Sequence, residues 1–323
     1  MKIAIIGPGA LGCLLAVSLK AGTDCEICIL DHNPERAKHL TKQGILLVQD
    51  IGETKYPVFV SSDANKIGPV DLVLLCVKSH HIPDALATAD PLFRSGNLTI
   101  AFQNGIGHLD FLLSAMHFPW AVGVTTLGAT LLAPGKVRKG GNGPTRFGFF
   151  NQDYENQQNV LQKTTVLFNS CGLETTIVPD IRETIWDKFI VNIGINALTA
   201  IHNIPNGKIL ESEQLGDSMQ QAVHEAMEVA TAKGITFSSD PLQTTKNVCK
   251  ATAANISSML QDVRMKRLTE IDAINGALVQ EARLLGIDTP ANTFLITEIK
   301  RIEAEFPPAG HRETTNPQKK VID

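Results

Sequence analysis

The stretch Lys2-Ile3-Ala4-Ile5-Ile6-Gly7-Pro8-Gly9-Ala10-Leu11-Gly12 decides the fold, because it joins a short apolar strand to a helix through a glycine-rich turn. Its glycines follow the pattern Gly-x-Gly-x-x-Gly. In such a unit the first glycine allows a tight turn, the second lets backbone N–H groups approach a pyrophosphate, and the third lets helix and strand pack closely. The helix N-terminus then stabilises the phosphate charge. The pattern therefore predicts a dinucleotide-binding turn, and the alternative is a turn that only permits packing.

An acidic residue follows this turn at the end of the next predicted strand. Asp31 lies 19 residues beyond Gly12. A carboxylate there accepts hydrogen bonds from the adenosine ribose 2′-OH and repels a 2′-phosphate, which favours NAD(H) over NADP(H). His32 and Arg36 follow closely and soften that preference. Alternatively, Asp31 only caps the helix that is expected to begin at Pro34.

Short apolar runs and helical stretches alternate over the first 125 residues or so. Strands are expected at 2–6, 26–30, 70–77 and 98–102, and helices at 10–21, 34–43 and 81–92. This alternation implies right-handed crossovers and a parallel sheet covered on both faces. The Gly-rich, β-branched stretch 121–150, with its Pro134-Gly135 turn, predicts antiparallel hairpin strands. The fold class is therefore α/β, with an N-terminal Rossmann-like domain.

The second half of the chain carries helical periodicity, with one short strand near 175–178. The expected helices are 184–201, 217–233, 241–285 with a break near Thr252, and 293–304. We expect a dinucleotide-binding domain at 1–180 and an all-helical substrate and catalytic domain at 181–306. The segment 307–323 lacks apolar periodicity and is expected to be a disordered tail.

Composition excludes several classes of partner. With 29 basic and 33 acidic residues the net charge is −4, which disfavours a broad surface for nucleic acid or anionic membrane. No apolar run is long enough for a bilayer span or a secretory signal. The six cysteines are few and lie mostly in apolar runs, and the pair Cys25 and Cys28 should point to opposite faces of a strand. We expect a cytoplasmic protein without a metal site.

A narrow polar stripe crosses one otherwise apolar helix. Lys188, Asn192 and Asn196 recur every four residues and therefore share one face. A solvated face would be broader and richer in charge, whereas an amine-and-amide ridge suits the lining of a cleft. A lysine among apolar neighbours can serve as a general acid or base. The alternative is an ordinary amphipathic surface helix.

A second polar segment precedes a charged helical run. Asn255, Ser257 and Ser258 lead into residues 259–270, in which Glu270 would lie three turns beyond Ser258 on one helix. The spacing by itself favours the exposed side of a long helix.

Together these residues resemble the ketopantoate reductase family over nearly the whole chain, to about residue 305. The matching motifs are G-x-G-A-L-G at 7–12, V-K at 77–78, Q-N-G-I-G at 103–107, W-x-K-x-x-x-N-x-x-x-N-x-L-T-A-I at 186–201, P-N-G at 205–207, N-I-S-S-M-L-Q-D at 255–262 and T-E-I-D-x-I-N-G at 269–276. The last two motifs are far more specific than the glycine turn.

The resemblance implies a role for each matched residue. Lys188 would be the catalytic lysine and Glu270 would lie near the nicotinamide. The substrate would be held by Asn192, Asn196, Asn206, Asn255, Ser257 and Ser258. The cofactor would contact Gly7, Pro8, Gly9, Ala10, Leu11, Gly12, Asp31, Lys78, Asn104, Ala129 and Glu270. Family members that use NADPH often carry a basic residue where this chain has Asp31, so NADP(H) is implied by resemblance while Asp31 favours NAD(H).

The expected reaction is NAD(P)H-dependent reduction of ketopantoate to pantoate, a precursor of pantothenate and coenzyme A. Lys188 would neutralise the developing alkoxide and donate the proton. Two alternatives stay open, namely a reductase of another branched 2-keto acid and a nicotinamide-binding regulator without turnover. The partner is then a small-molecule 2-keto acid, and a homodimer is compatible with the sequence.

Overall fold

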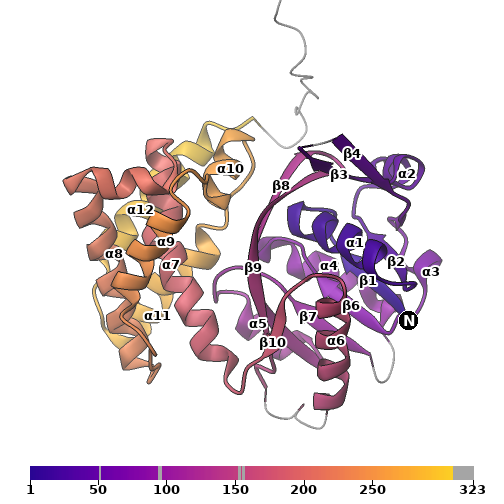
Figure 1. Ribbon diagram of the computed structural model, residues 1–323. Coiled ribbons are helices and arrows are strands. Elements are labelled where there is room, and N and C mark those ends of the chain that lie inside the picture. Colours follow the sequence, from indigo (N-terminus) through magenta and orange to yellow (C-terminus); the bar gives the residue numbers. More distant parts are fainter. Residues whose placement is uncertain (51, 94–96, 152–153, 155–156, 308–323) are drawn as a thin grey trace, which may run out of the picture. The chain divides into compact units, whose positions relative to one another are not determined.

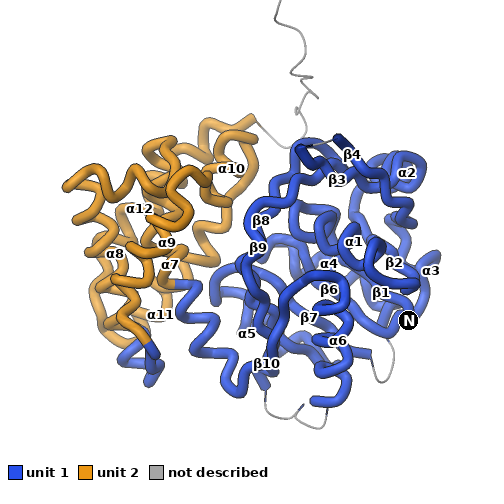
Figure 2. The backbone as a smooth tube through the Cα atoms, in the orientation of Figure 1, with its two compact units in different colours: residues 1–189, 230–238 blue, residues 190–229, 239–323 orange. Residues whose placement is uncertain are grey.

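The computed structural model describes residues 1–50, 52–93, 97–151, 154 and 157–307 (Figure 1). The chain divides into two compact units, one of residues 1–189 and 230–238 and the other of residues 190–229 and 239–323 (Figure 2). The domain boundary expected at residues 180 and 181 stays a prediction. The disordered tail expected at 307–323 lies, from residue 308 onward, outside the described residues.

The first unit is built on one mixed sheet. Its strands are β1 (Lys2–Ile6), β2 (Glu26–Leu30), β3 (Ile45–Gln49), β4 (Gly52–Tyr56), β5 (Phe59–Ser61), β6 (Leu72–Leu75), β7 (Leu98–Ala101), β8 (Trp120–Ala133), β9 (Lys136–Gly148) and β10 (Thr175–Ile177). The strand order is β4-β3-β9-β8-β7-β6-β1-β2-β5, with β10 beside β9. The β3–β4 and β8–β9 pairs are antiparallel. The α/β class and the hairpin at 121–150 are thereby confirmed.

The parallel part of the sheet has the doubly wound order expected of a dinucleotide-binding domain. Strands β2 and β5 lie in turn on one side of β1, and β6, β7 and β8 lie in turn on its other side, while the β3–β4 hairpin that separates β2 from β5 in sequence joins the sheet beyond β9. In such sheets ligands bind at the carboxyl ends of the strands where the order reverses. That point lies between β1 and β6, beside the glycine-rich turn.

Helices cover both faces of this sheet (Figure 1). They are α1 (Ala10–Gly22), α2 (Pro34–Gln43), α3 (Ala64–Ile67), α4 (Ile82–Ala89), α5 (Leu109–Ala115) and α6 (Gln158–Ser170), with short 3-10 turns at η1 (Ser79–His81) and η2 (Asp90–Leu92). Successive strand residues point to opposite faces. Ile3 and Ile5 therefore enter the core under α1 and α6, while Ala4 and Ile6 enter the core under α4 and α5.

The second unit is helical. Its elements are the later part of α7 (Ile181–His202), η4 (Asn206–Glu211), most of α8 (Glu213–Ala232), α9 (Pro241–Ala251), α10 (Ser258–Arg264), the π-helical η5 (Asp272–Gly276), α11 (Ala277–Leu285) and α12 (Pro290–Ala304). Among the described residues, no helix has the length and apolar character needed to cross a membrane.

The long helix expected over 241–285 is wrong beyond its break near Thr252. A new helix, α10, begins after Ser257, whose hydroxyl accepts a hydrogen bond from the Leu260 N–H. It ends at Arg264, and Lys266 has a φ of 49°, a left-handed conformation that a helix cannot continue through. Ser258 and Glu270 therefore do not share one helix face.

Candidate active site

Two glycines of the turn are required by the packing of the chain itself. Gly7 has a φ of 102°, and a Cβ at this position would lie 2.8 Å from Cγ1 of Val77. A Cβ on Gly12 would collide with the carbonyl oxygen of Gly7, because α1 crosses very close to β1 there. Any side chain at either position would push α1 or β6 away from β1.

Gly9 differs from both of these glycines. Its φ is −75°, which suits any residue, and the nearest atom to an added Cβ would be the Cys76 carbonyl oxygen at 3.9 Å, an ordinary contact. Packing therefore does not explain a glycine here. Gly9 is the N-cap of α1, so the first N–H groups of that helix are exposed beside it. Open space next to these donors fits the pyrophosphate of a dinucleotide.

Asp31 lies at the carboxyl end of β2 and is 1% exposed. Its carboxylate accepts hydrogen bonds from Nε and Nη2 of Arg36, at 2.6 and 2.5 Å. This hydrogen bonding raises the pKa of the Arg36 guanidinium. The cap of α2 is instead Asn33, whose Oδ1 accepts the Arg36 N–H at 2.9 Å. The alternative that Asp31 only caps the helix is therefore wrong, and Asp31 is one half of a two-point ion pair.

Lys188 contacts the loop that follows β7. Its Nζ donates a hydrogen bond to Oδ1 of Asn104 at 2.8 Å, although the two residues are 84 apart in sequence. The neighbouring Gln103 donates from Nε2 to the carbonyls of Leu75 and Val77 at 2.9 and 3.0 Å. Gln103 thereby ties the loop to the end of β6, next to the point where the strand order reverses. Lys188 is thus held at the ligand-binding edge of the sheet.

Two other predicted cofactor residues lie in the first unit. Lys78 directly follows Val77 and caps η1, so it stands at the carboxyl end of β6. Ala129 lies in the part of β8 that pairs with β9, and it packs against the same core cluster as Leu11.

Asn192 and Asn196 follow Lys188 on α7, one and two turns further along. Asn196 is 5% exposed and Asn192 is half-buried. Between Phe189 and Ala200 most side chains of α7 are buried. The alternative of an ordinary amphipathic surface helix is therefore wrong, and the amide groups belong to an interior helix.

The second unit joins several of the predicted substrate residues. The Asn206 N–H donates to the Asn255 carbonyl at 3.0 Å, and Nδ2 of Asn206 donates to Oγ1 of Thr252 at 2.9 Å. Oδ1 of Asn206 is buried and has no hydrogen-bond partner among the described residues.

The two serines of this segment have different surroundings. Ser257 is buried, and its hydroxyl accepts a hydrogen bond from Thr199 of α7 at 2.7 Å while capping α10. Ser258 is exposed at the first position of α10. Ser257 is therefore engaged in joining two helices, whereas the hydroxyl of Ser258 faces outward.

Glu270 is half-buried just before the π-helical turn. The preceding Thr269 donates both its N–H and its hydroxyl to Oε1 of Glu303, each at 2.7 Å. The Glu270 carbonyl accepts the N–H groups of Ala273 and Ile274. Glu303 was not predicted from the sequence, because its spacing within α12 does not distinguish it from an acidic residue on an exposed helix surface.

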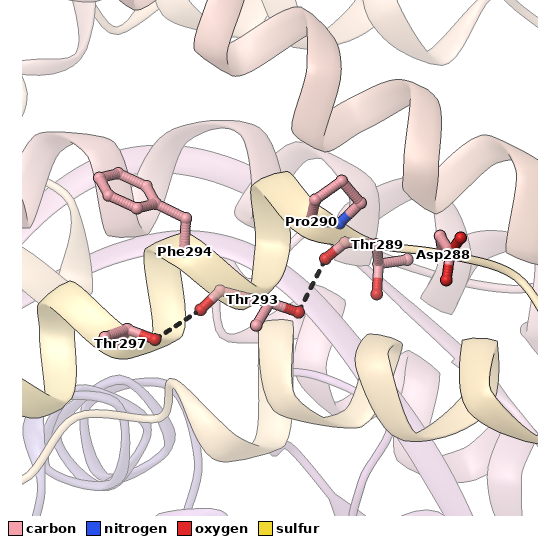
Figure 3. Close-up of a pocket in the computed structure, with 6 residues that line it drawn as sticks. All are labelled: Asp288, Thr289, Pro290, Thr293, Phe294 and Thr297. Carbon is pink, nitrogen blue, oxygen red and sulfur yellow. Dashed lines mark hydrogen bonds between the residues drawn. The ribbon is translucent and has the colours of Figure 1, made fainter.

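A pocket of about 510 Å³ opens beside the start of α12, but it coincides with none of these residues (Figure 3). It is lined by Asp288, Thr289, Pro290, Thr293, Phe294 and Thr297. The hydroxyls of Thr293 and Thr297 already donate to carbonyls of their own helix, so they offer little to a ligand.

Comparison with known proteins shows the family of the chain. Residues 3–152 match the family described as ketopantoate reductase PanE/ApbA, and residues 180–303 match its C-terminal part. A 2-dehydropantoate 2-reductase of Halobacterium salinarum is 33% identical over 90% of this chain and 95% of its own. A 2-dehydropantoate 2-reductase of Pyrococcus horikoshii is 31% identical over 94% of this chain and 98% of its own.

Solved structures give the same result. A ketopantoate reductase of this family from Ralstonia eutropha superposes with a TM-score of 0.84 at 28% identity, covering 94% of this chain and 99% of its own. A D-mandelate dehydrogenase, solved with NADH and anilino(oxo)acetate, has a TM-score of 0.87 at 24% identity over 95% and 99% of the two chains, which shows a shared fold. The chain thus belongs to the ketopantoate reductase family of NAD(P)-dependent oxidoreductases.

Proposed function

We propose that this protein reduces 2-dehydropantoate to pantoate with NADPH or NADH, in the cytoplasm, as a step toward pantothenate and coenzyme A. The observation that carries the proposal is the Lys188–Asn104 hydrogen bond of 2.8 Å, which holds an ammonium group at the ligand-binding edge of a doubly wound sheet. The reductases from Halobacterium and Pyrococcus support the substrate by their similarity over nearly the full chain.

The first unit fits a nicotinamide dinucleotide. The open space at Gly9 and the exposed donors of α1 suit the pyrophosphate, and Asp31 with Arg36 suits the adenosine ribose. The residues proposed to hold the cofactor are Gly7, Pro8, Gly9, Ala10, Leu11, Gly12, Asp31, Lys78, Asn104, Ala129 and Glu270. When bound, the dihydronicotinamide supplies the hydride.

Lys188 is proposed to act on the keto oxygen. As hydride reaches the carbonyl carbon, negative charge develops on this oxygen and must be neutralised. The Lys188 ammonium group stabilises that charge and donates the proton that completes the alcohol. Asn104 holds the amine through its side-chain oxygen and thereby helps to fix the orientation of the Lys188 side chain. Glu270 would orient Lys188 or the cofactor ribose.

The polar residues of the second unit are proposed to hold the substrate. Asn192 and Asn196 would donate to the hydroxyl and ketone oxygens. Ser258, with Asn255, would bind the carboxylate, while Asn206 and Ser257 fix the backbone of that segment through their own hydrogen bonds. Neutral donors are sufficient for one carboxylate when several converge on it.

The test is NADPH and NADH oxidation with a panel of 2-keto acids: ketopantoate, 2-ketoisovalerate, pyruvate and benzoylformate. We expect the highest kcat/KM with ketopantoate. A higher value with another branched or aromatic keto acid would assign the enzyme to that substrate. Binding of the dinucleotide without turnover of any keto acid would instead support a regulator.

The exposed serine of the substrate segment gives a matched pair of variants. Ser258→Ala should raise the KM for the keto acid about tenfold with little change in kcat, because one hydrogen bond to a charged group is lost. Ser257→Ala should instead lower the melting temperature, since it removes the cap of α10 and the link to Thr199. If Ser258→Ala leaves KM unchanged, the carboxylate is held elsewhere.

Asp31 and Arg36 should set the cofactor preference in opposite directions. Asp31→Asn removes a negative charge and releases Arg36 toward a 2′-phosphate, so the ratio of kcat/KM for NADPH to that for NADH should rise several-fold, a change of about 1 kcal/mol. Arg36→Gln should lower the same ratio, because the buried carboxylate loses its partner. Equal ratios in the wild type and both variants would remove this pair from cofactor selection.

A further inference from the structure

Three histidines gather at the carboxyl ends of the parallel strands of the first unit, and His80 and His81 have no role in the site described above. His32 directly follows Asp31 at the end of β2, and His80 and His81 lie in η1, beyond the end of β6. The rings of His32 and His81 are stacked with centroids 6.1 Å apart, and those of His80 and His81 meet edge-on at 4.2 Å. Residues 49 positions apart thus form one imidazole cluster.

This cluster stands next to the Asp31–Arg36 ion pair. Nδ1 of His32 lies 3.7 Å from Oδ1 of Asp31. The carboxylate is already neutralised by two hydrogen bonds from Arg36, so it offers no full charge to a protonated imidazole. The Asp31–Arg36 pair carries no net charge, so it does not repel an anion bound beside it.

The charged groups around His81 also favour binding of an anion. Burial lowers the pKa of His81, and the neighbouring His32 and Lys78 lower it further, while Asp84 raises it. Basic groups thus outnumber acidic ones around the ring. The protein without ligand holds His81 neutral over more of the pH range than a free histidine, and an added anion would reverse that effect.

The position of the cluster at the end of β2 indicates which anion it would bind. In a doubly wound domain the adenosine ribose lies at the end of the second strand, with its 2′ position next to the residue that corresponds to Asp31. A phosphate on that position has a second pKa of about 6 and carries nearly two charges at neutral pH. His32 adjoins Asp31 and Arg36 pairs with it, so both residues stand at the end of the strand where this position is expected.

We propose that His32 and His81, together with Arg36, form a proton-dependent site for the 2′-phosphate, so that the preference for NADPH over NADH strengthens as the pH falls. This inference rests on the proposed dinucleotide function. The site takes a phosphate monoester on an adenosine ribose, and NADH, which lacks that group, serves as the internal reference.

The sign of the pH dependence follows from linkage. A bound phosphate attracts the positive charge of an imidazolium ring beside it, and it therefore raises the pKa of His81 in the complex above its value in the free protein. The affinity for NADPH is then highest at a pH below the pKa of His81 in the free protein. It falls as the pH rises through the pKa of His81 in the complex. Arg36 stays charged throughout and adds no pH dependence. The phosphate's own ionisation opposes the trend by only about twofold.

The experiment measures the dissociation constants of NADPH and NADH by nicotinamide fluorescence between pH 6 and pH 8, at fixed ionic strength and without keto acid. The ratio that expresses preference for NADPH should fall about five- to tenfold over this range. In His32→Gln/His81→Gln it should change by less than about twofold. His117→Gln is the matched control, because His117 is exposed before β8 at the opposite edge of the sheet and should keep the wild-type slope.

The outcomes separate the two proposals. If neither dinucleotide binds, the proposed function itself fails. If both bind and the wild-type ratio is flat, or the double variant keeps the slope, the histidine site is overturned. Equal losses of NADPH and NADH affinity in the double variant at every pH also overturn it, since the rings would then support the adenine. His32→Gln by itself, at a side chain 75% exposed, should halve the slope on a logarithmic scale without threatening the fold.

Discussion

Lys188→Ala should lower kcat by about 10²-fold or more, because positioned proton transfer contributes about 10²- to 10⁴-fold to a rate. Lys188 supplies the ammonium group that Asn104 holds at the edge of the sheet. Alanine leaves the alkoxide without a cation or a proton donor at that point. The affinity for NADPH and NADH should stay near wild type, since the glycine turn and the Asp31–Arg36 pair are untouched.

The measurement compares single-turnover rates and dinucleotide dissociation constants for the wild type, Lys188→Ala and Lys250→Ala. Lys250 is an exposed lysine of α9 and controls for the general loss of one positive charge. Retention of more than half of the wild-type kcat in Lys188→Ala would remove this residue from the proton-donor role. A large loss of dinucleotide affinity instead of kcat would place it in cofactor binding.

The parallel core of the first unit could be predicted from the sequence because its strands are buried on both faces. Strands β1, β2 and β7 read as continuous apolar runs bounded by turn residues, and their expected and observed limits agree within one residue. The expected strand at 70–77 proved shorter, at Leu72–Leu75, because Val77 is already part of the ligand-binding edge.

Strand β4 could not be predicted in this way, because its sequence shows no apolar run. Strand β4 has the sequence Gly-Glu-Thr-Lys-Tyr, and its residues are exposed or half-buried on both faces, so neither alternation nor an apolar run marks it. It forms only because β3 offers it an edge with five paired positions. Such a strand depends on its neighbour, and a single sequence does not show the neighbour.

The candidate site was proposed residue by residue, and the structure adds contacts that the sequence does not show. The spacing of Lys188, Asn192 and Asn196 already placed them on one helix face, and burial now separates that face from a solvated one. The hydrogen bond from Lys188 to Asn104 spans 84 residues and depends on the fold. The same holds for the pairing of Asp31 with Arg36, because the sequence indicated only that Arg36 softens the preference for NAD(H).

Gly9→Ala should weaken the binding of both NADPH and NADH by about 10²-fold, because hydrogen bonds from backbone N–H groups to a charged phosphate contribute about 1.5–3 kcal/mol each. A Cβ at this position meets no protein atom closer than 3.9 Å. It would occupy the space proposed for the pyrophosphate beside the first turn of α1. The melting temperature should fall by no more than about 3 °C, the cost of a poorer N-cap residue.

Gly12→Ala is the matched control, because we expect it to lower stability through a collision within the protein. Its Cβ collides with the Gly7 carbonyl oxygen, so α1 must move away from β1 and the melting temperature should fall by about 5–10 °C. Thermal melts without ligand and dinucleotide titrations on both variants separate the two effects. If Gly9→Ala binds both dinucleotides within threefold of wild type, the turn serves packing alone and the pyrophosphate lies elsewhere. A loss of affinity at nearly unchanged stability would show that the missing side chain at Gly9 makes room for a ligand, since among the described residues the atom nearest to an added Cβ is the Cys76 carbonyl oxygen at 3.9 Å.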